Sequence, residues 1–85
     1  MQLPIDIDFR TMTEASLNNL VTGCRRTDGH LRREFYRCES LARSAKNDME
    51  RDFYEGRCET LKDEIHTNAK AHNLLLYILV FNYWS

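Results

Sequence analysis

Five closely spaced arginines are the residues of this chain best suited to binding chemistry: Arg25, Arg26, Arg32, Arg33 and Arg37. On a helix Arg26, Arg33 and Arg37 share one face, and the like charges of Arg33 and Arg37, four residues apart, destabilise that helix mildly. Guanidinium groups bind phosphate and carboxylate oxygens in forked pairs. The sequence therefore offers a candidate site for a phosphate-containing ligand, a nucleic acid or an acidic protein surface at Arg25, Arg26, Arg33 and Arg37.

An acidic stripe follows the arginines at helical spacing. It comprises Asp48, Asp52, Glu55, Glu59 and Asp63. Residues 25–46 hold seven basic and three acidic residues, a net charge of +4, whereas residues 47–64 hold the reverse, a net of −4. The two blocks can pair within one fold or between two copies of the chain. The stripe can also bind a protein partner, for example by mimicking nucleic-acid phosphates.

Metal and catalytic patterns are absent from the sequence. Zinc sites usually hold pairs of ligands two to five residues apart, whereas His66 and His72 are six apart and Cys58 lies eight residues before His66. No glycine-rich phosphate loop and no nucleophile elbow is present. We therefore expect no metal, no cofactor and no enzymatic activity.

Heptad-like spacing predicts most of the helical structure. Apolar or small residues recur at steps of four and three along two runs. The first run is Leu31, Phe35, Cys38, Ala42, Ala45 and Met49, and the second is Tyr54, Cys58, Leu61, Ile65, Asn68, His72, Leu75 and Leu79. The two runs are out of phase, which predicts a break near 46–48, favoured over a break near Gly56. Asn68 and His72, being polar, are expected to set the register or the oligomeric state.

The remaining segments complete the expected order of elements. Pro4 and the alternation of apolar with acidic residues predict an extended arm over 1–10. A threonine cap predicts a first helix over 11–23 that stops at Gly23, because glycine commonly ends helices. Turn-forming residues at 27–29 precede a second helix over 28–46, with Asn47 as a left-handed cap, and a third helix covers 48–81.

The apolar tail over 74–84 is the strongest candidate for an interface. We favour a helix there, with a buried strand as the alternative. Its aromatic residues are more than a short helix can bury alone, and exposed aromatic patches mark sites of association. The expected interface residues are Tyr77, Phe81, Tyr83 and Trp84.

Composition limits the range of functions. The chain has 85 residues and a net charge of −1, so it forms one small domain with no overall attraction to nucleic acid or anionic membrane. Its longest apolar run is eight residues, whereas a membrane-spanning helix needs about 20. Three cysteines without a CxxC pair indicate a reducing compartment. We expect a cytoplasmic, all-α protein that is a three-helix arrangement or a helical hairpin, oligomeric and most simply a dimer, with no membrane partner.

Three functional hypotheses agree with these features. The first is a small binding protein, an inhibitor or adaptor, that occupies a protein partner stoichiometrically. The short, glycine-poor chain has the general look of phage or plasmid accessory proteins, for which a host defence or nucleic-acid enzyme would be the target. The second hypothesis is a binder of nucleic acid or a phosphate ligand through the arginines, and the third is a purely structural oligomerisation module.

Overall fold

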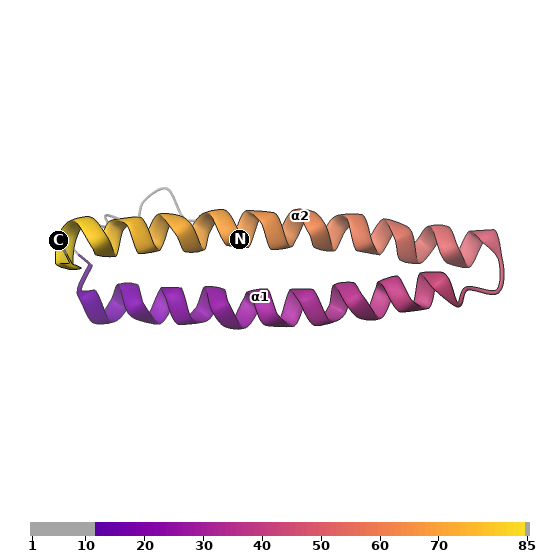
Figure 1. Ribbon diagram of the computed structural model, residues 1–85, viewed down its shortest axis with the longest axis horizontal. Helices are drawn as coiled ribbons and strands as arrows, with labels where there is room; N and C mark the ends of the chain where they lie inside the picture. Colours follow the sequence, from indigo (N-terminus) through magenta and orange to yellow (C-terminus); the bar gives the residue numbers. More distant parts are fainter. Residues whose placement is uncertain (1–11, 85) are drawn as a thin grey trace.

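The protein is an all-α helical hairpin. The computed structural model describes residues 12–84, in which helix α1 (Glu14–Arg43) runs antiparallel to helix α2 (Asp48–Leu79), as Figure 1 shows. A short π-helix, η1 (Val80–Trp84), continues α2. The molecule is elongated, with principal extents of 53 × 21 × 16 Å. The hairpin form of the predicted fold is therefore confirmed, whereas the expected arm over 1–10 lies outside the described residues.

The reversal between the helices lies at the break favoured from the sequence. α1 ends at Arg43, and α2 begins after Asn47, whose side-chain oxygen accepts a hydrogen bond from the Glu50 amide at 2.8 Å. Asn47 is thus an N-cap with an extended backbone and not the left-handed cap that was predicted. Asp48 and Glu50 place negative charge in the first turn, where the helix dipole favours it. α2 runs through Gly56, so a break at that residue is wrong.

The predicted separation of residues 11–23 from residues 28–46 is wrong. α1 begins after the cap Thr13 and runs without interruption through Gly23 and through the turn-like residues 27–29. The Asp28 carboxylate accepts a forked hydrogen bond from Arg32 Nε, at 3.0 and 2.9 Å, in place of the turn contacts expected of it. Tertiary packing therefore outweighs local turn preference, and the three-helix alternative does not apply.

Two apolar clusters hold the hairpin together. The cluster at the end where α1 begins and α2 ends contains Leu17, Val21, Cys24, Ala71, Leu75 and Leu79, and the cluster toward the loop contains Cys38, Cys58 and Leu61. Five of these nine residues belong to the predicted seams: Cys38, Cys58, Leu61, Leu75 and Leu79. The predicted seam position Met49 is not buried, since it is 83% exposed in the first turn of α2. The tail is helical through Leu79, which confirms the favoured assignment over the strand.

Replacing Gly23 or Gly29 with alanine is expected to stabilise the protein. Neither glycine has a positive φ, and a Cβ at either position meets no atom of another element within 4 Å. Alanine in a helix interior is worth about 0.5–1 kcal/mol over glycine. Gly23→Ala and Gly29→Ala should each raise the free energy of unfolding by about that amount in urea titrations followed by circular dichroism.

The reverse change on an exposed position of the same helix, Ala15→Gly, serves as the control and should lower stability by a similar amount. If a helix ended at Gly23 or at residues 27–29, the Gly→Ala changes would lower the free energy of unfolding, because alanine adopts the left-handed conformation poorly.

Candidate interaction surfaces

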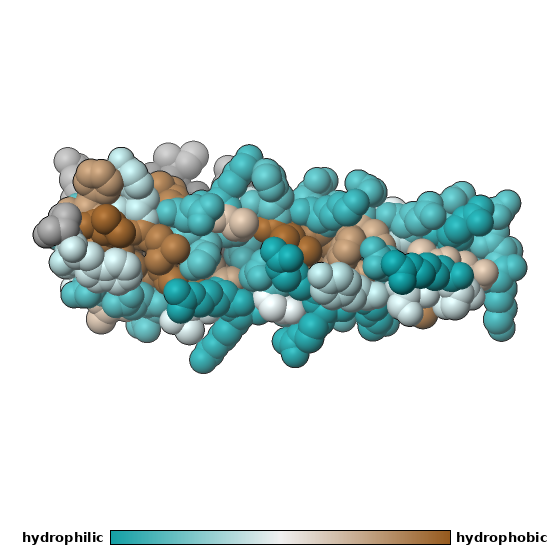
Figure 2. Space-filling view, viewed as in Figure 1, coloured by the Kyte–Doolittle hydropathy of each residue, from teal (hydrophilic) through white to brown (hydrophobic). Residues whose placement is uncertain are grey.

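An exposed apolar stripe follows α2 into η1. Leu74, Tyr77, Phe81 and Trp84 recur at steps of three, four and three, and we call them the terminal stripe. Their exposed fractions are 44%, 60%, 61% and 51%. The rings of Tyr77 and Phe81 lie 4.4 Å apart between centroids. Figure 2 shows hydrophobic side chains gathered at this end of the molecule.

Two of the four predicted interface aromatics also bond back to the hairpin. The Tyr83 hydroxyl donates to the Met12 carbonyl, and Trp84 Nε1 donates to a carboxylate oxygen of Glu14 at 2.9 Å. These contacts tie η1 to the beginning of α1. Tyr77 and Phe81 therefore form the outward part of the predicted interface, while Tyr83 and Trp84 also position it.

The arginines all lie on the exposed part of α1, but they differ in their partners. Arg37 pairs with Glu34 at 3.0 Å, which lowers the pKa of that carboxyl, and Arg33 Nε donates to the Gly29 carbonyl at 3.3 Å. Arg25 and Arg26 make no ion pair or hydrogen bond with other described residues. The predicted anion site is thus a row along one helix and not an enclosed pocket.

The expected pairing of the basic block with the acidic block within one fold is wrong for residues 12–84. Every ion pair among these residues joins side chains three or four residues apart on the same helix. In the acidic stripe Asp48 pairs with Arg51 and Glu59 with Lys62, at 2.7 and 3.6 Å. Asp52, Glu55 and Asp63 form no ion pair in the described part of the chain.

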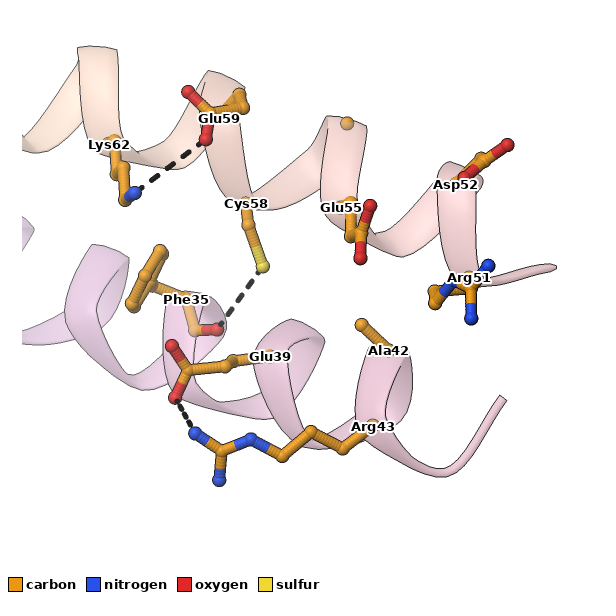
Figure 3. A pocket seen from close by; sticks show the side chains of 11 residues that line it. Phe35, Glu39, Ala42, Arg43, Arg51, Asp52, Glu55, Cys58, Glu59 and Lys62 are labelled. Atoms are coloured by element: carbon orange, nitrogen blue, oxygen red, sulfur yellow. Dashed lines mark hydrogen bonds and ion pairs between the residues drawn. The ribbon is translucent and has the colours of Figure 1, made fainter. Parts of the chain in front are cut away.

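A groove, missed by the sequence reasoning, runs between the helices on one face of the hairpin. Its most voluminous part, about 700 Å³, lies toward the loop, where Glu55 points from α2 toward Ala42 and Cys58 points toward the Phe35 carbonyl of α1 (Figure 3). Two smaller hollows of about 330 and 270 Å³ continue it. Adjoining hollows share lining residues, first Phe35 and Lys62, then Arg32 and Ala69. We call this row of adjoining hollows the seam groove.

A polar layer separates the two apolar clusters at one end of the seam groove. Asn68, only 1% exposed, donates from Nδ2 to the Cys24 carbonyl at 2.8 Å. Its Oδ1 and the Nε2 of His72 are buried without a hydrogen-bond partner among the described residues. Both residues line the last hollow together with Arg25, Asp28 and Arg32. The predicted polar seam positions thus lie one turn apart on α2 and face residues of α1 across the same hollow.

The described residues show no metal centre. All three cysteines are buried and free, and no group of three or more His, Cys, Asp or Glu side chains within 12–84 is placed to hold a metal ion. Neither α1 nor α2 combines the length and the apolar character that crossing a membrane requires.

Comparisons with models of protein families, with curated proteins and with solved structures find no significant match.

Burial should protect the cysteine thiols of the native protein. Desolvation raises the pKa of Cys24 and of Cys58 above the ordinary value. At pH 8 we expect alkylation of the native thiols to be at least ten-fold slower than in urea-unfolded protein, measured by mass spectrometry. Because the folded-state pKa values are raised, the thiols stabilise the fold below the unfolded pKa, near 8.5, and this contribution is lost as pH rises through the raised values. Native thiols that react as fast as unfolded ones would contradict the packed seam.

Proposed function

We propose that this chain is a small, non-catalytic binding protein, an inhibitor or adaptor, that occupies a protein partner stoichiometrically through the terminal stripe. The observation that supports this proposal is the exposure of Leu74, Tyr77, Phe81 and Trp84 in one row. Small proteins rarely leave contiguous apolar surface uncovered without a use for it. Tyrosine and tryptophan are also the residues most often found at the energetic centre of interfaces.

The rigidity of the terminal stripe supports a docking role. The stripe lies on continuous helical backbone, and the tilted contact between the rings of Tyr77 and Phe81 limits their rotation. The hydrogen bond from Trp84 to Glu14 restrains the end of η1. Binding therefore requires little additional ordering of side chains, which reduces the entropic cost of association. The row fits the mode in which one face of a helix lies in an apolar groove of its partner.

Changing the outward aromatics should weaken partner binding without unfolding the hairpin. We expect Tyr77→Ser and Phe81→Ser each to raise the dissociation constant at least ten-fold, because truncating an aromatic anchor typically costs 2 kcal/mol or more, as an order-of-magnitude value. The partner is first isolated with tagged protein and identified by mass spectrometry. It is then titrated in purified form by calorimetry, which should give one partner per chain.

Phe53→Ser is the matched control, because Phe53 is 63% exposed but lies near the loop. Its dissociation constant should stay within about two-fold of the unchanged protein's, within the small range usual for surface substitutions. Circular dichroism confirms that each variant is folded. An effect of Phe53→Ser equal to that of Tyr77→Ser would place the docking surface elsewhere.

A second candidate function is anion binding by α1. It is favoured by Arg25 and Arg26, which lack ion-pair partners among residues 12–84. In this case the protein should bind a fluorescent oligonucleotide with an affinity that falls steeply with salt. Arg25→Gln combined with Arg26→Gln should reduce the salt slope by about one to two, as expected for two lost phosphate contacts. The control is Arg43→Gln, because Arg43 already pairs with Glu39 at 3.0 Å. Absence of any salt-dependent binding excludes this candidate.

A further inference from the structure

The seam groove has the dimensions of a helix-binding site. Its lining residues on α1 extend from Arg25 to Arg43, a distance of about 27 Å at 1.5 Å per residue. Small residues line it at the positions nearest the seam: Ala42, Gly56, Cys58 and Ala69. Because helices pack closely where side chains are small, the groove can receive another helix along most of its length.

The chain exposes more surface than a compact monomer of its mass would. The accessible surface is 6330 Å² for a chain of 10.1 kDa. A compact monomer of that mass exposes about 5,300 Å² by the general scaling with mass. The excess, about 1,000 Å², is close to the roughly 800 Å² that each partner buries in a stable interface. One further copy of the hairpin is therefore the right size to complete the core.

The walls of the seam groove carry opposite charges. The α1 wall presents three basic side chains, Arg25, Arg32 and Arg43, against two acidic ones, Asp28 and Glu39, a net charge of +1. The α2 wall presents three acidic side chains, Asp52, Glu55 and Glu59, against two basic ones, Arg51 and Lys62. Asp52 and Glu55 have no ion-pair partner in the described part of the chain. A surface with one wall of each sign is complementary to itself after a two-fold rotation.

We propose that a second copy of this chain docks groove to groove, forming a two-fold symmetric four-helix bundle. The symmetry axis runs parallel to the helices, so α1 of each copy lies antiparallel to α2 of the other. The basic wall then meets the acidic wall twice. An axis perpendicular to the helices would place α1 against α1 and α2 against α2, which brings like charges together. The charges of the two walls therefore favour a second copy as the partner and a symmetry axis parallel to the helices.

The polar layer gives the same arrangement a register. With the axis along the helices, both copies of Asn68 lie at one height in the bundle. Arg25 of each α1 then lies across from the other copy's α2 near Asn68 and His72, where the buried Oδ1 and Nε2 lack partners. Buried polar residues at seam positions commonly fix register and oligomeric state.

This inference uses a surface distinct from the terminal stripe, so it can fail independently of the proposed function. Sedimentation equilibrium should give twice the 10.1 kDa chain mass at micromolar concentration. Asp52→Lys combined with Glu55→Lys removes the acidic wall and should raise the dimer dissociation constant at least ten-fold. Adding Arg32→Glu and Arg43→Glu to that variant makes the facing α1 wall acidic and should restore at least half of the lost binding free energy.

The control is Asp63→Lys combined with Glu64→Lys, which makes the same change of charge on α2 at residues that do not line the groove. It should leave the dissociation constant within three-fold. A monomer at 100 µM, or equal weakening by the two double variants, overturns the proposal. Dissociation by Tyr77→Ser without any effect of the Asp52 and Glu55 changes would place self-association on the terminal stripe instead. If no partner binds the terminal stripe while the dimer persists, the proposed function is overturned and the dimer proposal stands.

Discussion

The structure depends on a single seam between two helices. Within residues 12–84 no third long helix covers that seam, so its stability requires the two helices to approach closely along their whole length. Small side chains allow this approach, since four of the nine buried apolar residues in this part of the chain are cysteine or alanine. Cys38 and Cys58 pack at the loop end, where the thiol of Cys58 lies 3.9 Å from the Phe35 carbonyl oxygen. The cysteines of this protein therefore serve as small core residues.

The same choice of small residues makes the two halves of the hairpin different. Toward the beginning of α1 and the end of α2, Leu17, Leu75 and Leu79 are completely buried and fill the seam. Toward the loop Ala42, Gly56 and Cys58 leave the seam groove open on one face. The well-filled half provides a rigid base for the terminal stripe, while the thinner half has apolar and charged surface still to be covered. The two surfaces proposed for binding follow from this division.

The seam could be predicted from the sequence, and so could the break between the helices. What the prediction missed is the continuity of α1, although the signal was present. Counting back from Leu31, the four-three spacing continues through Asp28, Cys24, Val21 and Leu17 without a change of phase. Gly23 and residues 27–29 carry local stop signals, but the register of the buried face overrides them. A helix that keeps one buried face over 30 residues gains more from packing than two internal glycines lose.

The seam groove could not be predicted, because it depends on which side of the seam the larger side chains fill. The charge reversal in the sequence indicates which surfaces are basic and acidic, but it does not predict which side chains form ion pairs. It suggested that the basic and acidic blocks meet within one fold, but each paired arginine bonds a carboxylate one turn away on its own helix. Such pairs need little ordering beyond the helix itself, whereas pairs between helices would have to span the groove. Asp52 and Glu55 consequently have no ion-pair partner among the described residues. The opposite charge of the facing α1 wall supports the proposal that a second copy of this chain supplies that partner.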